Sequence, residues 1–354
     1  MSKRVVVGMS GGVDSSVAAL LLKQQGYEVV GLFMKNWDER DDNGVCTSAQ
    51  DYESAQRTCD VLDIPLQAIE FTKEYQEFVF KEFLSDYKSG FTPNPDILCN
   101  REIKFKVFYE KALSLGASYL ATGHYCQTDQ KLLIKGKDPL KDQSYFLCGI
   151  HGKVLNHVLF PIGNMEKSAV RELAHKHNLP VWNRKDSTGI CFIGERNFRE
   201  FLSSYIPANP GEFQTLDGTK VGQHHGSAFY TLGQRKGLGL GGPGPRWHVV
   251  AKDHEQNIVY VERNHDHPAL YSTTIYCDPI HWIYESEYQK TPFQCHAKIR
   301  YRQEDQECTI LESQGTQTKV QFKDPQWAAA PGQTIAFYDK HICFASARIR
   351  KTEE

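Results

Sequence analysis

Up to about residue 200, the chain alternates between two kinds of hydrophobic pattern. Short apolar runs predict strands, and apolar positions spaced three to four residues apart predict helices between them. This alternation indicates right-handed βαβ units and a parallel sheet covered by helices on both faces, which is a doubly wound α/β fold. The predicted strands cover 4–9, 28–34, 66–71 and 118–123, and the predicted helices cover 14–25, 48–62, 73–88 and 103–115.

The pattern changes after about residue 200. Helical spacing fades, glycine turns multiply, most densely over 237–245, and short alternating strands follow. These strands are predicted at 248–251, 258–262, 295–302, 308–311, 319–322 and 334–338. They are typical of small antiparallel β structure. We therefore expect an α/β domain over 1–200, a small β-rich linking domain over 201–267 and a C-terminal β-barrel over 268–354.

The most specific local motif is the glycine turn Ser10-Gly11-Gly12-Val13-Asp14-Ser15, which joins the first strand to the first helix. Two glycines allow a tight turn that points backbone N–H groups into one concavity, and the helix N-terminus adds partial positive charge. Such a nest binds phosphate. The lysine of a Walker loop is missing. The turn resembles the PP-loop of enzymes that split ATP into AMP and pyrophosphate; the alternative is an ordinary βα turn of small residues.

Two later segments should lie beside this turn. Ligands of parallel sheets bind at the carboxyl ends of the strands. Met34 ends the second predicted strand, and Gly123-His124 follows a later one. We expect all three segments to meet in one crevice.

The bulk composition narrows the class of protein. With 40% hydrophobic and 24% charged residues, it is typical of a globular domain, and no apolar run is long enough to cross a bilayer. The first strand begins too early for a signal peptide to precede it, so a cytoplasmic protein is expected. A net charge of -2 does not indicate a nucleic-acid binder. The late basic residues favour a solvated strand face on charge alone; they are Lys298, Arg300, Arg302, Arg348, Arg350 and Lys351.

The chain has ten cysteines and no Cys-x-x-Cys pair. This spacing argues against a zinc ribbon or an iron–sulfur cluster, and a cytosolic chain favours thiols over structural disulfides. Most of the cysteines, such as Cys148 and Cys295, stand among apolar neighbours and are predicted to be small core residues.

Two cysteines, Cys99 and Cys191, stand in sequence surroundings that suit a reactive thiol. Cys99 follows two prolines in a predicted stiff, extended loop, with a helix expected to begin near Arg101. A thiol beside a helix N-terminus and basic side chains ionises more readily, and Asp96 could move a proton. A loop cysteine with a capping aspartate is an equal alternative. Cys191 stands between glycines at 189 and 194, and on this evidence alone a buried strand cysteine is favoured.

Taken together, the motifs resemble the family of tRNA-specific 2-thiouridylases over essentially the whole chain. They stand in the family's order, and no functional position departs from its pattern. The pair Cys99 and Cys191 separates this family from other proteins with the same loop. The motifs are Gly8–Ser15, Asn94–Asn100, Thr122–Tyr125, Lys141–Phe146, Ser187–Gly194 and Tyr230–Gly237.

The resemblance implies three groups of site residues. The ATP phosphates would be held by Gly8, Met9, Ser10, Gly11, Gly12, Val13, Asp14 and Ser15, with Met34 and Gly123 at the adenosine. The target base would be surrounded by Asn94, Pro95 and Asp96. Further tRNA contacts would come from His124, Lys141, Asp142, Gln143, Arg300, Tyr301 and Gln333. The resemblance thus favours an RNA contact over a solvated strand face for the basic residues near 300. In such a contact, Arg300 can bind phosphate and Tyr301 can stack on a base.

The resemblance also implies a reaction, which is 2-thiolation of the wobble uridine of tRNA. ATP, with Mg²⁺, would adenylate the C2 oxygen of uracil, and a persulfide on Cys191 would deliver sulfur directly or after release as hydrosulfide. A transient Cys99–Cys191 disulfide would complete the transfer, with Asp96 as acid or base. The expected partners are tRNA and a sulfur donor, either a cysteine desulfurase or a relay protein. A monomer without zinc, iron–sulfur cluster or membrane association is expected.

Four other functions remain as alternatives. A lysidine-forming synthetase would need no cysteine pair, and a cluster-dependent thiolase would need Cys-x-x-Cys. A small-molecule ligase of the argininosuccinate or NAD synthetase kind would have no use for an RNA-facing barrel. A nucleotide-binding module without catalysis would bind ATP and release no pyrophosphate.

Overall fold

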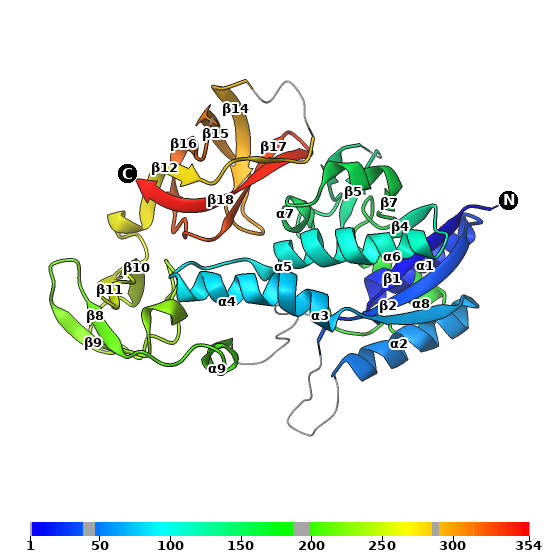
Figure 1. Ribbon diagram of the computed structural model, residues 1–354, viewed down its shortest axis with the longest axis horizontal. Coiled ribbons are helices and arrows are strands. Elements are labelled where there is room, and N and C mark those ends of the chain that lie inside the picture. The colour runs from blue at the N-terminus through cyan, green and yellow to red at the C-terminus, as the bar shows by residue number, and fades with distance from the viewer. Residues whose placement is uncertain are drawn as a thin grey trace.

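A computed structural model describes residues 2–37, 47–129, 131–186, 198–284, 290–313 and 315–353. Figure 1 shows three parts along the chain: an α/β part at the N-terminal side, a small β-rich part, and a barrel at the C-terminal side. This confirms the predicted fold class of an α/β part followed by β structure. Within the described residues, no helix combines the length and apolar composition that crossing a membrane requires.

The N-terminal part is built on a parallel sheet with the strand order β3-β2-β1-β4-β7. The chain moves outward from β1 in one direction and then in the other, which makes the sheet doubly wound. The hydrophobic pattern predicts every strand except β7, which has only two residues. The strands are β1 (Arg4–Met9), β2 (Glu28–Lys35), β3 (Leu66–Glu70), β4 (Tyr119–Ala121) and β7 (Val158–Leu159).

Helices cover both faces of this sheet, and β1 shows why. Its alternate residues Val5 and Val7 belong to one buried cluster, while Val6 belongs to another. The first cluster includes residues of α1 (Val13–Gln24), α2 (Thr47–Leu62) and α8 (Lys167–Lys176). The second includes residues of α3 (Thr72–Tyr75), η1 (Gln76–Phe80), α4 (Lys81–Lys88), α5 (Pro95–Leu98), η2 (Cys99–Val107) and α6 (Phe108–Ser114).

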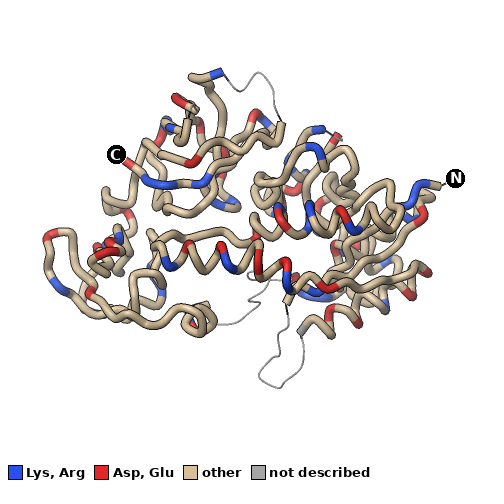
Figure 2. The backbone as a smooth tube through the Cα atoms, in the orientation of Figure 1, with Lys and Arg blue, Asp and Glu red and all other residues tan. Residues whose placement is uncertain are grey.

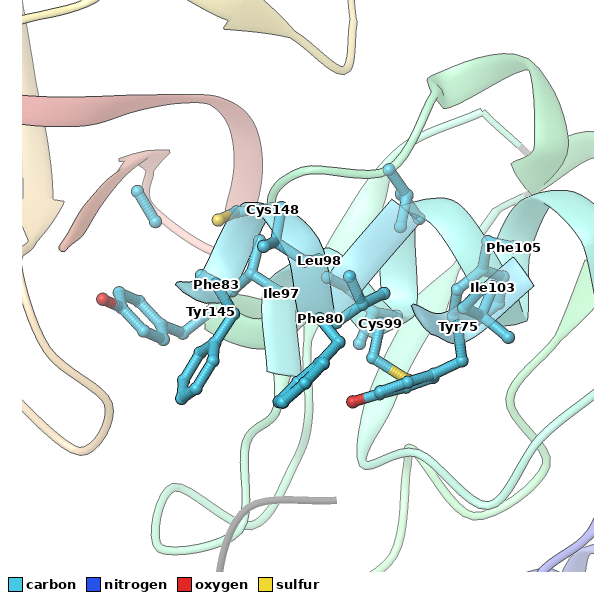
Figure 3. Packing of buried hydrophobic residues seen from close by; sticks show 14 of the residues in the cluster. Tyr75, Phe80, Phe83, Ile97, Leu98, Cys99, Ile103, Phe105, Tyr145 and Cys148 are labelled. Atoms are coloured by element: carbon cyan, nitrogen blue, oxygen red, sulfur yellow. The ribbon is translucent and has the colours of Figure 1, made fainter. Parts of the chain in front are cut away.

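The second cluster extends beyond the N-terminal part. It includes Phe213 and Val249 of the central part and Tyr338 of the barrel, all fully buried. Figure 3 shows its centre, where Cys99, Tyr75 and Tyr145 are packed among aliphatic and phenylalanine side chains. A shared core of this kind fixes the three parts relative to one another.

The central part is a sheet with the order β10-β11-β8-β9. The sequence predicts antiparallel pairing throughout, and this is wrong for one pair, because β11 runs parallel to β8. The chain between these two strands contains β9 and β10, which leaves room for a parallel crossover. The elements are α9 (Phe198–Ser203), β8 (Gly211–Gln214), β9 (Lys220–His224), η4 (Ser227–Phe229), β10 (Trp247–Asp253) and β11 (Ile258–Arg263).

The C-terminal part is a closed barrel. Its strands follow the order β12-β16-β15-β14-β17-β18, and pairing of β12 with β18 closes it. The predicted strand over 295–302 is wrong at its end, because β14 stops at Lys298 and Arg300–Arg302 form a turn in which Arg302 has a φ of 65°. The elements are η5 (Pro268–Leu270), β12 (Tyr271–Cys277), β13 (His281–Trp282), β14 (Phe293–Lys298), β15 (Gln306–Glu312), β16 (Thr318–Trp327), β17 (Thr334–Asp339) and β18 (Ile342–Glu353).

One pairing joins the barrel to the N-terminal part and has no signal in the sequence. A hairpin of β5 (Cys126–Thr128) and β6 (Leu133–Lys135) continues the barrel sheet, with β6 antiparallel to β18. The chain after it forms α7 (Ser144–Leu147) and η3 (Gly152–His157). In α7, the Tyr145 hydroxyl donates to the carbonyl of Thr334 at 2.8 Å. The N-terminal part and the barrel therefore share both a sheet and a side-chain hydrogen bond.

Lys252 links the central part to the end of the α4 segment. Its Nζ donates to the carbonyls of Gly90 and Tyr230, each at 2.8 Å. Burial lowers the pKa of Lys252 from 10.5 to about 8. The folded chain therefore binds fewer protons than the unfolded chain between these pH values, and its stability rises with pH across that window.

We expect Lys252→Met to remove this pH dependence. Wild type should gain about 2 kcal/mol of unfolding free energy between about pH 7 and about pH 9.5 from this group, and the variant should lose that increment. Urea unfolding at the two pH values measures the difference. Lys88→Met, at an exposed position of α4, serves as the control. Equal pH dependence in wild type and Lys252→Met would contradict the assigned pKa.

Candidate functional site

The glycine turn after β1 has the geometry of a phosphate-binding loop. Gly11 has a φ of 74°, and Gly12 is the N-cap of α1. The Ser10 and Ser15 hydroxyls lie 3.1 Å apart, and the Ser15 hydroxyl also donates to the carbonyl of Gly12 at 3.2 Å. Within the described chain, the amides of Val13, Asp14 and Ser15 donate to no protein acceptor. The first turn of α1 thus presents N–H groups to a bound anion.

Backbone packing around the loop requires glycine at two positions. A Cβ on Gly11 would lie 2.3 Å from the carbonyl oxygen of Asp51. A Cβ on Gly123 would lie 2.6 Å from the amide nitrogen of Ser15. Gly123 therefore packs directly against the start of α1, and any side chain there would cover the N–H groups of the loop. The predicted meeting of the loop with Gly123 is present in the structure.

A network of charges lies beside the loop. Lys167, the first residue of α8, donates to both carboxylate oxygens of Asp14 at 2.8 Å and contacts Asp186 at 2.8 Å. Lys141 and Arg171 also bind Asp186, each at 2.6 Å. Burial alone raises the pKa of Asp186, yet hydrogen bonds from Lys141 and Lys167 outweigh it and hold this pKa well below its usual value.

The network also includes Tyr125, whose hydroxyl donates to Asp14 at 2.7 Å. Burial, then the negative charge of Asp14, raises the pKa of Tyr125, so the phenol keeps its proton at neutral pH. Arg184 donates to the carbonyl of Gly11 at 2.7 Å and pairs with Asp51. A phosphate entering the loop would therefore meet several cations that are already held in place.

The segment that carries Asp96 and Cys99 is helical, which corrects the predicted extended loop. The helix begins at Pro95, well before the predicted start near Arg101, with the side chain of Asn94 accepting from the Asp96 amide at 3.2 Å. Asn at the N-cap and Pro at the first helical position are favourable for a helix start. Cys99 therefore lies in the second turn of the helix, and only 1% of it is exposed.

Helical geometry brings Asp96 and Cys99 together. They are three residues apart and thus lie on the same face of the helix. Cys99 also begins η2, a π-helical segment, and such segments are frequent at functional sites. Arg101, predicted to favour thiolate at Cys99, binds Glu102 at 2.7 Å. Its charge is therefore balanced by a carboxylate close by. Cys191 and its motif Ser187–Gly194 lie outside the described residues, so the Cys99–Cys191 pairing stays a prediction.

The predicted RNA-contacting residues of the N-terminal part differ in their surroundings. Burial, then the charge of Lys104, keeps the pKa of His124 well below its usual value, so its imidazole is neutral. The Asp142 carboxylate is buried and accepts from the amides of Gly136 and Ser144. Gln143 is half-buried, and its side chain accepts from the Tyr125 amide at 2.9 Å. In the structure, Asp142 and Gln143 hold the fold at this position.

Thr92, two residues before Asn94, joins all three parts of the molecule. Its amide donates to the carbonyl of Pro331 at 2.9 Å, and its own carbonyl accepts from Gln333 at 2.7 Å. Its hydroxyl lies 3.2 Å from the hydroxyl of Thr231 in the central part. The barrel and the central part therefore both position the segment that leads into Asn94–Asn100.

The predicted barrel residues lie at this same junction. Arg300 donates to the carbonyl of Trp327 at 2.9 Å and lies over its ring. The Tyr301 ring contacts Phe146 at a centroid distance of 4.4 Å. Because Phe146 and the predicted residues Lys141, Asp142 and Gln143 lie in one segment, the structure brings these groups together.

Several residues of the site have no signal in the sequence. Lys167, Arg171 and Arg184 are isolated residues, far in sequence from the loop that they surround. Tyr125 lies within the motif Thr122–Tyr125, but no role is predicted for it there. Met34 and Gly8 do follow the prediction, since both lie at the carboxyl end of their strands. Eight of the cysteines are buried, among them Cys148 and Cys295, which confirms these two as core residues.

Comparison with known proteins gives matches along the whole chain. The family model described as tRNA methyl transferase HUP domain matches residues 3–195, the PRC-barrel domain of the same series matches 199–263, and the aminomethyltransferase β-barrel domain matches 272–349. The tRNA-specific 2-thiouridylase of Protochlamydia amoebophila is 56% identical over 99% of this chain and 94% of its own length. The tRNA-specific 2-thiouridylase of Bacillus subtilis is 52% identical over 98% of this chain and 94% of its own length.

Solved structures are more distant. The NMN synthetase of Francisella tularensis is 20% identical, with a TM-score of 0.35, over 56% of this chain and 71% of its own.

We expect Gly123→Ala to weaken ATP binding by about tenfold or more, because the new methyl group would collide with the Ser15 amide. Calorimetric titration with ATP measures the dissociation constant. Gly241→Ala is the control, since a Cβ there meets nothing within 4 Å. Unchanged ATP affinity in Gly123→Ala would show that the loop is not the nucleotide site.

Proposed function

This chain belongs to the family of tRNA-specific 2-thiouridylases, and on that premise we propose that it forms 2-thiouridine at the wobble position of tRNA. The assignment rests on two features that the structure places in the same part of the molecule. A glycine loop with unused N–H groups lies against Gly123, and a helix in the same part of the molecule presents Asp96 and Cys99 one turn apart. The loop suits activation by ATP, and the helix suits thiol chemistry.

The first step is activation of the base. The C2 oxygen of uracil attacks the α-phosphorus of ATP, pyrophosphate leaves, and the base carries AMP as a leaving group. Asn94, Pro95 and Asp96 surround the base, while Gly8–Ser15 hold the phosphates and Met34 and Gly123 contact the adenosine. A wobble base lies in a single-stranded loop, so turning it outward costs less than extracting a base from a duplex.

Lys167 supplies a positive charge beside the glycine loop. In the structure its ammonium group is shared by Asp14 and Asp186. A triphosphate adds negative charge beside this group and competes with the carboxylates for its N–H donors. We therefore assign Lys167 to the phosphates, where it stabilises the charge that develops as pyrophosphate leaves.

Mg²⁺ would accompany ATP. Among the described residues, no group of three or more His, Cys, Asp or Glu side chains is arranged to hold a metal ion. Asp14, an oxygen donor at the loop, fits an ion that is held chiefly by phosphates and water. Such an ion neutralises phosphate charge, and Asp14 would exchange its contact with Lys167 for it.

The second step transfers sulfur. The outer sulfur of a Cys191 persulfide attacks C2 of the activated base, and the C–O bond to AMP breaks. The Cys99 thiol gives up its proton, to Asp96 in this assignment, and attacks the Cys191 sulfur. The S–S bond of the persulfide breaks, the transferred sulfur keeps the electron pair, and a Cys99–Cys191 disulfide forms. Two external thiols, or one dithiol, then reduce the disulfide to the two free cysteines and become a disulfide themselves. Release of hydrosulfide before the attack is the alternative order.

The partners follow from this chemistry. His124, Lys141, Asp142, Gln143, Arg300, Tyr301 and Gln333 are proposed to contact the tRNA, directly or by holding the contacting segment. The persulfide is supplied by a cysteine desulfurase or a sulfur-relay protein. We propose that the chain acts in the cytoplasm as a monomer.

The deciding experiment follows labelled sulfur into unmodified tRNA with ATP and a persulfide donor. Wild type should form 2-thiouridine at the wobble position, and Cys99→Ser and Cys191→Ser should lose about a thousandfold in rate, as removal of a catalytic thiol does. Cys277→Ser, a buried cysteine of the barrel, is the control. Full thiolation by Cys191→Ser would exclude the persulfide role, and pyrophosphate release with no thionucleoside from wild type would exclude the sulfur chemistry.

A separate test concerns Lys167. Lys167→Met should slow tRNA-dependent pyrophosphate release by about a hundredfold, because it removes a cation aimed at the phosphates. Binding of tRNA should not change. Lys176→Met, an exposed residue at the other end of α8, is the matched control. A wild-type rate in Lys167→Met would make the lysine a structural partner of Asp14 only.

A further inference from the structure

The glycine-rich segment after Tyr230 takes no part in the reaction described above, yet it builds a cavity in the central part. The cavity has a volume of about 310 Å³. Three arginines and a tryptophan line it together with glycine backbone, and no carboxylate does. The lining side chains that carry the argument are Arg235, Arg246, Trp247 and Arg263.

Arg263 is fixed in place within this cavity. Its guanidinium group lies over the ring of Trp247, 4.2 Å from the centroid. It donates to the carbonyl of Pro245 at 2.7 Å and to that of Gly241 at 3.3 Å, and the Trp247 indole donates to the same Gly241 carbonyl at 3.1 Å. Because a guanidinium has five N–H donors, some remain for a ligand.

Among the described residues, the other donors of the cavity have no carboxylate or backbone partner. In the part of the chain that the structure describes, none of Arg235, Arg246 and Arg263 forms an ion pair with a carboxylate. No described acceptor binds the amide N–H groups over 237–245 either. Gly242 and Gly244 have φ values of 96° and 100°, conformations that only glycine adopts readily. Unpaired arginines around free backbone amides form an anion site.

A chain of contacts connects this cavity to the proposed base site. Thr231, at the start of the segment, contacts Thr92 beside Asn94. Gly233 packs against the Trp327 ring, since a Cβ on it would lie 2.6 Å from that ring. The backbone carbonyl of Trp327 accepts a hydrogen bond from Arg300. The segment that lines the cavity therefore begins beside residues for which RNA contacts are proposed.

We propose that Arg235, Arg246 and Arg263 bind a backbone phosphate of the tRNA, outside the wobble nucleotide. This inference rests on the proposed function, since it takes tRNA as the substrate. Arginine and backbone N–H groups match the oxygens of a phosphodiester. Trp247 is covered by Arg263 on one face, so the site lacks an open aromatic pair between which a base could stack. The contact is therefore independent of sequence and positions the RNA for the base site.

The test measures tRNA affinity of Arg235→Gln/Arg246→Gln over a range of salt concentrations. At about 100 mM salt the variant should bind tRNA about tenfold more weakly, and the magnitude of the slope of log K against log salt should fall by about 0.7–0.9, the loss of one phosphate contact. Arg235→Lys/Arg246→Lys should keep most of the affinity, which separates charge from a folding defect. Arg57→Gln, on α2 and paired with Glu53, is the matched control.

The outcomes separate this inference from the proposed function. Absence of tRNA binding by wild type would contradict the proposed function itself. Binding by wild type with the same affinity and slope in the glutamine variant would overturn the phosphate site. Normal tRNA binding by that variant, with loss of sulfur transfer from the donor protein, would also overturn it and assign the cavity to an acidic surface of that donor.

Discussion

The hydrogen bonds of Thr92 are the constraint on which the rest of the site depends. One residue of the N-terminal part binds the barrel through Pro331 and Gln333 and the central part through Thr231. The helix with Asp96 and Cys99 starts immediately afterwards. If the barrel moved, this helix start would move with it. Under the proposed function, contact of RNA with the barrel would thereby be coupled to the position of Asp96 and Cys99, with no separate signal required.

Charge is the second organising principle. Lys167 stands between Asp14 and Asp186 and is 9% exposed. An unpaired cation at this depth would be costly, so the carboxylates keep the site stable while no phosphate is present. The same pairing limits how strongly the loop attracts anions. A nucleotide must displace carboxylates to reach the lysine, which favours a ligand with several negative charges over a single phosphate.

The sequence predicts what local interactions decide. The strand, glycine loop and helix over 4–24 match because hydrophobic period and turn chemistry suffice there. The helix start at Pro95 carries its own signal, an Asn N-cap and a proline at the first helical position, although two prolines so close together also favour an extended loop. The pairing of β6 with β18 joins segments about two hundred residues apart and leaves no local trace. The approach of Lys167 and Arg184 to the loop depends likewise on the complete fold.

Net charge says little about RNA binding here because several basic residues of the barrel are already paired with carboxylates. Lys298 contacts Asp305, Arg348 pairs with Asp86, and Arg350 pairs with Asp278. Figure 2 shows several Lys and Arg positions, in blue, along the backbone that leads to the C-terminus. The cavity arginines of the central part lack such carboxylates. Affinity for a polyanion depends on unpaired charges and not on their total, so a chain with a net charge of -2 can hold RNA through a few well-placed groups.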